Sequence, residues 1–416
     1  MPKNVIVAQS GGPSPVINNS LRGVLDACME QPAQFGKVYG AWHGIEGVLK
    51  EELLDLSAQA AKEIALLATT PAAGAIGTCR YKLKNEQSRD FDRIIAVMQA
   101  HNVGYFFYIG GNDSMDTAHK ISRIARDKGL DLIATGVPKT IDNDVGDSEF
   151  KLIDHTPGYG SVARYWACLI QNANEENAGS CPSDPVLVIQ MMGRKIGFIP
   201  AAARLADPQR QFPLQIYMPE SGLTLAQLAD SVNDELKRSG RCIVALSEGF
   251  DVGDIGAVQD DFGHVAFGAS NLTAQQVVVS YLNAKGLSAR GFAHGQVSGT
   301  DQRSTSVLAS TVDLDEAYQV GRHAVEIARR DGSGSGWMST ILRVPGRKYG
   351  VRFDKVPLEQ VANSERSFPQ AWLSPSKIDV TDDFLRYAQP LIGTKWVKIP
   401  LENGIQRFTR FQPIFA

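Results

Sequence analysis

The sequence PKTIDND, residues 138–144, places two carboxylates, a hydroxyl, an amide and a lysine directly after an apolar run, residues 130–137, that is typical of a buried strand. In open α/β sheets, ligands gather at the carboxyl ends of strands, where loops present short side chains from a rigid sheet. A capped turn also uses Asx residues, and Pro138 favours an extended residue before it. A turn needs only one Asx residue, so we predict an active-site loop.

Four further strand-like runs end in loops of a similar kind. Paired glycines between a strand and a helix let backbone N–H groups approach an anion, and the helix dipole favours the anion there. Tight strand-to-helix turns also use glycine for steric reasons, so each pair alone is a weak signal. The runs are residues 4–8, 105–109, 186–191 and 242–247, and their loops hold Gly11 and Gly12, Gly110 and Gly111, Met192 to Arg194, and Glu248.

In order and approximate spacing these motifs resemble those of the phosphofructokinases, over roughly residues 4–325. Within that family the chain is similar to the pyrophosphate-dependent branch, because ATP-using members carry glycine where this chain has Asp113 and Lys139. The resemblance implies an α/β fold of two facing three-layer α/β/α, Rossmann-like domains with a C-terminal extension.

The alternation of strand-like and helix-like segments through about residue 330 also indicates a parallel sheet covered on both faces. We expect an N-terminal domain at 1–145 that binds pyrophosphate and magnesium, a sugar-phosphate domain at 146–330 with the chain crossing back around 250–310, and a hairpin and extension at 331–416. The predicted helices span residues 114–126, 224–237 with Thr224 as N-cap, 271–284 and 315–329, and the hairpin strands span 341–344 and 349–353.

Composition excludes several classes of function. The 416 residues are 43% hydrophobic and 21% charged, with a formal net charge of -3. A chain of this length buries a large core and divides into two or three domains. A nucleic-acid-binding protein would show a basic excess or stripe, so no nucleic-acid partner is expected. Anionic substrates must therefore be met by a local cluster of arginine and lysine.

The five cysteines are scattered, odd in number and without a C-x-x-C pair, so neither a disulfide framework nor a zinc site is expected. No apolar run reaches about 18 residues, and the first expected strand is entered by Val5 without an apolar leader. We therefore expect a cytoplasmic enzyme with no membrane partner.

The resemblance implies a role for each residue of the PKTIDND loop. Asp142 would remove the proton from the 1-hydroxyl of fructose 6-phosphate, the acceptor. Thr140 and Asp144 would hold the sugar and the base, and Ile141 would also line the substrate site. Lys139 would neutralise charge on the transferred and leaving phosphates.

The resemblance also implies a pyrophosphate site. Gly11 and Gly12 would offer backbone N–H groups to pyrophosphate, and Arg80 would join Lys139 as a catalytic cation. Taken alone, Arg80 could equally be a surface arginine. Asp113 and Asn112 would bind Mg²⁺; the carboxylate is the better ligand, and the family often has aspartate at the position of Asn112.

For the sugar phosphate, the resemblance points to Met192, Gly193 and Arg194, and to Glu248 as the acid that binds sugar hydroxyls. His294 matches the start of a late-strand pattern whose arginine is Val297 in this chain. A second arginine, which relatives lend from a neighbouring subunit, is also missing, with Pro185 near its place. The candidates to replace these arginines are Arg290, Arg303, Arg347 and Arg352, with Arg290 preferred.

The sequence thus predicts reversible phosphoryl transfer from pyrophosphate to fructose 6-phosphate by a homo-oligomer, a dimer or tetramer, with Mg²⁺ as cofactor. One alternative is an ATP-dependent 6-phosphofructokinase or a related sugar, NAD or lipid kinase. The other is a non-catalytic sensor on the same scaffold, which would require the loss of the base at Asp142.

Overall fold

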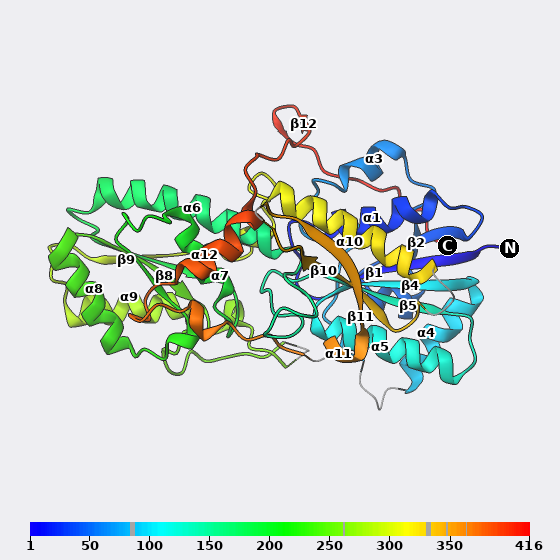
Figure 1. The fold of residues 1–416 in the computed structure, drawn as a ribbon, viewed down its shortest axis with the longest axis horizontal. Helices are drawn as coiled ribbons and strands as arrows, with labels where there is room; N and C mark the ends of the chain where they lie inside the picture. The colour runs from blue at the N-terminus through cyan, green and yellow to red at the C-terminus, as the bar shows by residue number, and fades with distance from the viewer. Residues whose placement is uncertain (84–87, 261–262, 330–333, 347, 363) are drawn as a thin grey trace. The chain divides into compact units, whose positions relative to one another are not determined.

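The computed structural model describes residues 1–83, 88–260, 263–329, 334–346, 348–362 and 364–416 (Figure 1). The chain folds into two compact units, and each unit is assembled from separate segments of the sequence. The first unit holds residues 1–158, 303–366 and 394–416, and the second holds residues 159–302 and 367–393.

A seven-stranded sheet forms the centre of the first unit, in the order β11-β10-β5-β4-β1-β2-β3. The five inner strands are mutually parallel, and only the pairs β10–β11 and β2–β3 are antiparallel. The carboxyl ends of β1, β4 and β5 therefore meet at one edge of the sheet. The strands are β1 (Lys3–Gln9), β2 (Phe35–Ala41), β3 (Leu53–Asp55), β4 (Val103–Gly110), β5 (Ile133–Pro138), β10 (Trp337–Arg343) and β11 (Val351–Pro357).

Helices cover both faces of this sheet. Ile6 and Ala8 of β1 belong to the core cluster that contains α4 and α5, while Val5 and Val7 belong to the cluster that contains α1 and α10. A strand buried on both faces is continuously apolar, which explains the run at residues 4–8. The helices of this unit are α1 (Ile17–Met29), α2 (Ile45–Lys50), α3 (Ala61–Leu66), α4 (Ser88–Ala100), α5 (Asn112–Asp127), α10 (Thr311–Arg329) and α11 (Leu358–Val361).

The second unit contains a four-stranded parallel sheet in the order β7-β8-β6-β9. Its edge strand β9 is exposed from His294 to Val297. The strands are β6 (Val186–Met191), β7 (Leu214–Tyr217), β8 (Cys242–Ser247) and β9 (Ala293–Val297), and the helices are α6 (Tyr159–Ser180), α7 (Phe198–Ala201), α8 (Leu225–Ser239), α9 (Ala274–Lys285) and α12 (Asp382–Ala388).

Short elements complete the two units. The 3₁₀ helices are η1 (Ala202–Ala206), η2 (Pro219–Ser221), η3 (Phe267–Ala269), η4 (Asp301–Arg303), η5 (Gln370–Trp372) and η6 (Gln389–Ile392), and β12 (Leu401–Glu402) pairs with β13 (Ile405–Gln406).

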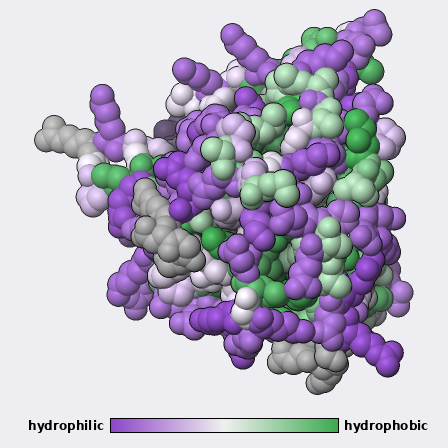
Figure 2. All heavy atoms as spheres, turned by 90° about the vertical axis from the view of Figure 1, so that its right-hand side faces the viewer, coloured by the Kyte–Doolittle hydropathy of each residue, from purple (hydrophilic) through white to green (hydrophobic). Residues whose placement is uncertain are grey.

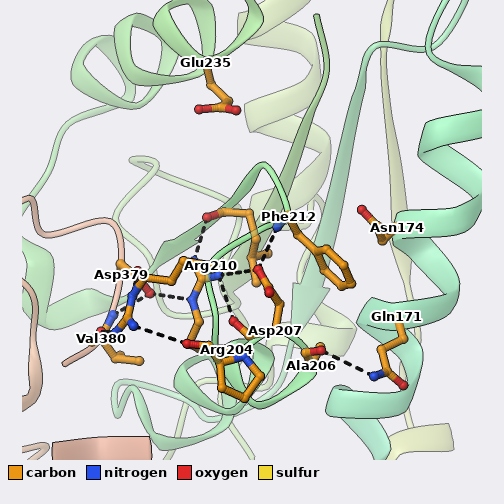
Figure 3. A network of polar contacts seen from close by, with 12 residues as sticks. Gln171, Asn174, Arg204, Ala206, Asp207, Arg210, Phe212, Glu235, Asp379 and Val380 are labelled. Carbon is orange, nitrogen blue, oxygen red and sulfur yellow. Dashed lines mark hydrogen bonds and ion pairs between the residues drawn. The ribbon is translucent and has the colours of Figure 1, made fainter. Parts of the chain in front are cut away.

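A buried arginine ties the late segment of the second unit to its sheet. Arg204 is 2% exposed, and its Nε donates to Asp379 at 2.8 Å (Figure 3). Its Nη2 donates to the carbonyl oxygen of Leu214 at 3.0 Å. Asp379 also accepts from Nε of Arg210 at 3.1 Å. Buried charges need such partners, since an isolated one is costly.

The end of the first unit in Figure 2 is mostly hydrophilic, with smaller hydrophobic areas between the polar side chains. Among the described residues, no helix is both long and apolar enough to span a membrane.

The predicted helices exist, although three of their starts differ. The expected helix at 224–237 is α8, and Thr224 is its N-cap in a reciprocal capping box with Gln227. The helix expected from 114 begins at Asn112, the one from 271 begins at Ala274, and the one from 315 begins at Thr311. The hairpin at 341–353 is β10–β11, which is longer than predicted and continues the first sheet through β5.

Glycines allow α1 and α10 to pack closely. A Cβ on Gly23 would lie 2.1 Å from the carbonyl oxygen of Tyr318, and a Cβ on Gly321 would lie 2.3 Å from that of Ser20. Real side chains do not approach backbone so closely, so each substitution would push the helices apart.

We therefore predict that Gly23→Ala lowers the free energy of unfolding by about 1–3 kcal/mol through overpacking. Gly179→Ala is the matched control, because Gly179 lies in α6 and a Cβ there would meet nothing within 4 Å, and alanine in a helix is worth about 1 kcal/mol over glycine. Calorimetric melting of both variants checks this, and equal behaviour of the two would contradict the close packing.

Candidate active site

Lys139 is the buried centre of the loops at the carboxyl ends of β1, β4 and β5. It follows β5 directly, and its backbone N–H donates to the carbonyl oxygen of Gly110 at 2.9 Å. Its side chain is 2% exposed, and Nζ donates to the carbonyl oxygens of Ser10, at 2.9 Å, and Gly12. Burial lowers the pKa of Lys139 to about 7, and the positive charges of Arg80 and Arg303 act in the same direction.

The glycine loop after β1 lies against this cation. Gly11 has a φ of +74°, which favours glycine, and its N–H donates to the carbonyl oxygen of Cys79 at 2.9 Å. Thr78 Oγ1 donates to the carbonyl oxygen of Gly11 at 2.9 Å. The segment that carries Arg80 is thereby fixed beside the glycine loop.

Gly12 faces two guanidinium groups. A Cβ there would lie 3.0 Å from Nη1 of Arg303 and 3.3 Å from Nη2 of Arg80. Together with Lys139, these cations surround one turn of backbone, which is an arrangement suited to a compact polyanion. The sequence predicts Arg303 only as a replacement arginine for the sugar phosphate, whereas the structure brings it to the glycine loop of the first unit.

The loop after β4 carries the residues predicted to bind metal. Gly111 is the N-cap of α5, and Asn112 and Asp113 are its first two residues. Lys82, which the sequence did not single out, pairs with Asp113 at 2.8 Å. Oδ1 of Asn112 is buried and has no hydrogen-bond partner within the described part of the chain.

These two residues fit a magnesium ion. No group of three or more His, Cys, Asp or Glu that could hold a metal occurs among the described residues. Mg²⁺ needs no such cage, because it commonly takes one or two protein carboxylates and completes its shell with substrate phosphates and water. The Asp113 carboxylate and the unsatisfied amide oxygen of Asn112 are oxygen ligands of this kind.

The predicted catalytic loop is fixed at its start. Thr140 pairs with Gly158, and its N–H donates to the carbonyl oxygen of Pro157 at 3.2 Å. Thr140 Oγ1 accepts from the N–H of Asp142 at 3.1 Å, so the hydroxyl supports the backbone beneath that carboxylate. Asp142 is partly exposed, whereas Ile141 is buried.

Asp144 is 8% exposed, and its Oδ1 has no hydrogen-bond partner in the residues that the structure describes. The negative charges of Asp142 and Asp144 act to raise the pKa of Lys139 against the larger effects of burial and the two arginines. The loop thus places two carboxylates near Lys139, and a carboxylate within hydrogen-bond reach of a bound hydroxyl is able to act as its general base.

A buried histidine network supports the segment that pairs with Thr140. His155 is 1% exposed, and its ring nitrogens bond Asp154 at 2.8 Å and Glu316 of α10 at 2.7 Å. Tyr349 donates to the other oxygen of Glu316 at 2.5 Å, and Arg343 donates to Asp154 at 3.0 Å. Burial opposes the charged imidazolium, but the Glu316 charge and the bonds to both carboxylates raise the pKa of His155 to about 9.

In the second unit, the predicted sugar-phosphate residues that follow β6 and β8 come together. The N–H of Arg194 donates to Oε1 of Glu248 at 2.9 Å, and Glu248 N–H donates to the carbonyl oxygen of Met191 at 2.9 Å. Gly193 has a φ of +124°. The N–H of Met192 donates to Oε1 of Gln302 at 3.1 Å.

The sequence did not identify Gln302, nor His264, whose Nδ1 lies 3.1 Å from Nη1 of Arg194. A polar residue outside any motif gives no local signal, so only the fold reveals these neighbours.

The other residues predicted for the sugar-phosphate site do not belong to these loops. His294 of β9 pairs with Asp184 at 2.7 Å, and Arg290 is exposed just before that strand. Arg352 pairs with Asp354 on β11. Arg347 lies outside the described residues.

The family model described as Phosphofructokinase matches residues 4–328. This chain belongs to the phosphofructokinase family.

Its relatives include the pyrophosphate--fructose 6-phosphate 1-phosphotransferase of Halomonas elongata, 37% identical over 98% of this chain and 96% of that protein. The protein of the same name from Xanthomonas campestris is 38% identical over 94% of this chain and 91% of that protein. The structure is similar to that of the pyrophosphate-dependent phosphofructokinase from Marinobacter aquaeolei, with a TM-score of 0.88 and 33% identity over 100% of this chain and 97% of that one.

The raised pKa of His155 generates a test of stability against pH. Because the folded-state pKa lies above the ordinary value of 6.5, the stabilisation is fully present below pH 6.5 and is lost as the pH rises through 9. We predict that His155→Gln costs about 3 kcal/mol more at pH 6 than at pH 10, measured by urea unfolding.

His119→Gln serves as control. Burial lowers the pKa of His119, followed in effect by the charge of Arg123, so its contribution to stability should not shrink as the pH rises. A cost of His155→Gln that stays constant from pH 6 to pH 10 would refute the charged state of the network.

Proposed function

We propose that this protein transfers a phosphoryl group reversibly from pyrophosphate to the 1-hydroxyl of fructose 6-phosphate, giving fructose 1,6-bisphosphate and phosphate, in glycolysis and gluconeogenesis. The observation that carries the proposal is the Lys139 ammonium, buried behind the Gly12 turn that also faces two arginines. Three cations around one turn suit a small, highly charged donor. The names of the relatives, which cover nearly the whole chain, support the same activity.

Phosphoryl transfer needs in-line positioning, charge neutralisation and a base for the acceptor hydroxyl. We assign the base to Asp142, whose backbone is held by Thr140, and the charge neutralisation to Lys139 and Arg80. Arg303 joins these cations because it approaches Gly12 from the same side of the loop as Arg80. Gly11 and Gly12 would bind the donor through their backbone.

Mg²⁺ is the metal we propose, held by Asp113 with Asn112; when bound, it would neutralise charge on the pyrophosphate oxygens. The Lys82 ammonium now pairs with Asp113 and would compete with a metal for that carboxylate. The first unit would therefore bind pyrophosphate and metal.

We assign the sugar phosphate to the second unit. Met192, Gly193 and Arg194 form one loop whose backbone is bonded to the Glu248 carboxylate. In the proposal the Arg194 guanidinium binds the phosphate and Glu248 accepts from a sugar hydroxyl. His294 and Arg290, on and before the edge strand β9, would contribute from the same unit or from a partner subunit.

We further propose a homo-oligomer that works in the cytoplasm. All five cysteines are free thiols, as a reducing compartment favours. Phe292, just before the edge strand β9, is 66% exposed, and Val297, the last residue of β9, is 46% exposed. In the proposal a second subunit covers this apolar surface.

Replacing the proposed base tests the catalytic assignment. We expect Asp142→Asn to keep the fold and pyrophosphate binding but to lower turnover by about 10²–10⁴-fold, the usual worth of a positioned general base. Asp92→Asn, a surface variant on α4, is the control and should retain turnover. A variant at Asp142 with more than about half of wild-type turnover would remove this residue from the role.

We attribute the preference for pyrophosphate over ATP as phosphoryl donor to Lys139 and Asp113. A carboxylate about 4 Å from a nucleotide's α-phosphate costs about 4 kcal/mol at an effective dielectric of 20, so Asp113 should exclude ATP. In a turnover panel of pyrophosphate against ATP with several sugar phosphates, we expect activity with Mg²⁺–pyrophosphate in both directions and none with ATP.

Two variants test the roles of Lys139 and Asp113 in donor choice. Lys139→Gly should mainly lower turnover with pyrophosphate, because the leaving phosphate loses its cation. Asp113→Gly combined with Lys139→Gly should admit some ATP. Wild-type turnover of ATP as fast as pyrophosphate, or a folded double variant without ATP binding, would disprove the exclusion argument.

The oligomeric state is checked by light scattering of the wild-type protein, for which we expect a dimer or tetramer. If Arg290 completes a neighbouring subunit's sugar-phosphate site, Arg290→Ala should raise the KM for fructose 6-phosphate without changing the mass. A stable, fully active monomer would overturn the proposal.

A further inference from the structure

Arg366 is a buried arginine in the segment that follows the family match at 4–328. Its side chain is 0% exposed. The guanidinium donates from Nε to the carbonyl oxygen of Asp147 at 2.9 Å, from Nη1 to that of Asp154 at 2.9 Å, and from Nη2 to that of Ile153. Its Cζ lies 4.3 Å from the centre of the Phe150 ring.

These contacts organise a stretch that lacks regular structure. Between β5 and α6 the chain forms only turns, bends and single bridges, so its carbonyl groups cannot be satisfied by a helix or sheet. The planar fork of a guanidinium offers five N–H donors in fixed directions, and three carbonyl groups converge on it here. The Arg366 guanidinium thus supplies hydrogen-bond donors to carbonyl groups that a helix or sheet would otherwise satisfy.

The same arginine reaches the residues that follow Asp142. Nη1 donates to Oδ1 of Asn143 at 3.5 Å, and the Arg366 backbone N–H donates to the carbonyl oxygen of Asp144 at 2.8 Å. Asn143 has a φ of +59°, and its Oδ1 also accepts from the N–H of Thr156 at 3.1 Å. Thr140 holds the backbone of Asp142 from the other side.

We propose that Arg366 is a positioning residue, which sets the place of the Asp142 carboxylate through Asn143 and Asp144. The inference rests on the proposed function, because it needs Asp142 to act as the base. The pyrophosphate loop has separate supports, namely the bonds of Gly11 to Cys79 and of Lys139 to Gly110 and Ser10. Loss of Arg366 should therefore affect the chemical step more than donor binding.

The test compares Arg366→Lys with Arg204→Lys. Lysine keeps the charge but has a single ammonium, which cannot reach the same set of carbonyl oxygens. Arg204 is the matched control. It is also buried, and it is bonded to both carbonyl and carboxylate oxygens, including those of Asp379 (Figure 3). It belongs to the second unit and is far from the PKTIDND loop in sequence.

We expect Arg366→Lys to lower kcat by about 10²-fold, because a misplacement of about 1 Å has an effect of that size. The dissociation constant of pyrophosphate, measured by calorimetry, should change by less than about twofold, since its contacts are intact. Arg204→Lys should keep kcat near wild type at a temperature where both variants remain folded by circular dichroism. Equal kcat for the two variants, or a loss of pyrophosphate binding that parallels the loss of kcat, would overturn the proposal.

If Arg366→Lys does not fold, a second variant tests the positioning role of Arg366. Asn143→Gly suits the positive φ and removes the amide oxygen that Arg366 and Thr156 share. It should lower kcat with unchanged pyrophosphate binding, and adding Arg366→Lys, where that protein folds, should lower kcat by less than the product of the separate effects. Unchanged kcat in Asn143→Gly would reject the positioning role.

Asp142→Asn separates this inference from the proposed function. If that variant loses turnover while Arg366→Lys and Asn143→Gly keep it, only the positioning role fails. If Asp142→Asn keeps turnover, the assignment of the base itself is wrong.

Discussion

One buried lysine, Lys139, holds together two of the loops at the carboxyl edge of the first sheet. The Lys139 ammonium connects the loop after β1 to the loop after β5, although β4 lies between these strands in the sheet. Burial disfavours the charged amine, and two guanidinium groups at the same turn disfavour it further, which is why its pKa falls to about 7. An anion beside Lys139 would favour its charged form. A polyanion bound at the Gly12 turn would supply such a charge, which agrees with the proposed pyrophosphate donor.

Much of the fold follows from local sequence signals. The strands β6 and β8 occupy the predicted residues because short β-branched runs bounded by polar loops have few alternatives. Helix starts are predicted less accurately, because an apolar pattern does not reveal which side chain caps the helix. Ser310 Oγ accepts from the N–H groups of Val312 and Asp313, and Thr273 forms a capping box with Gln276, so α10 begins earlier and α9 later than the apolar pattern alone indicates.

The site is predictable only where its residues are neighbours in sequence. The PKTIDND loop and the two glycine loops carry dense local patterns, and the structure brings them together because parallel strands end at one edge of a sheet. Arg303 and Gln302 carry no such pattern. They are adjacent in sequence, yet Gln302 bonds Met192 in the second unit while Arg303 lies at Gly12 in the first. Surface and site arginines look alike in a sequence, so only the fold distinguishes them.

The passages of the chain between the units explain why distant residues enter these loops. The chain leaves the first unit after Gly158, which pairs with Thr140, and returns at Arg303, which faces Gly12. It leaves again after Arg366, which is bonded to Asn143 and Asp144. Each of these passages therefore carries a contact to a loop that follows β1 or β5. The geometry of the site is set by residues at chain crossings as well as by motifs, and the crossing at Arg366 lies beyond the residues that the family model matches.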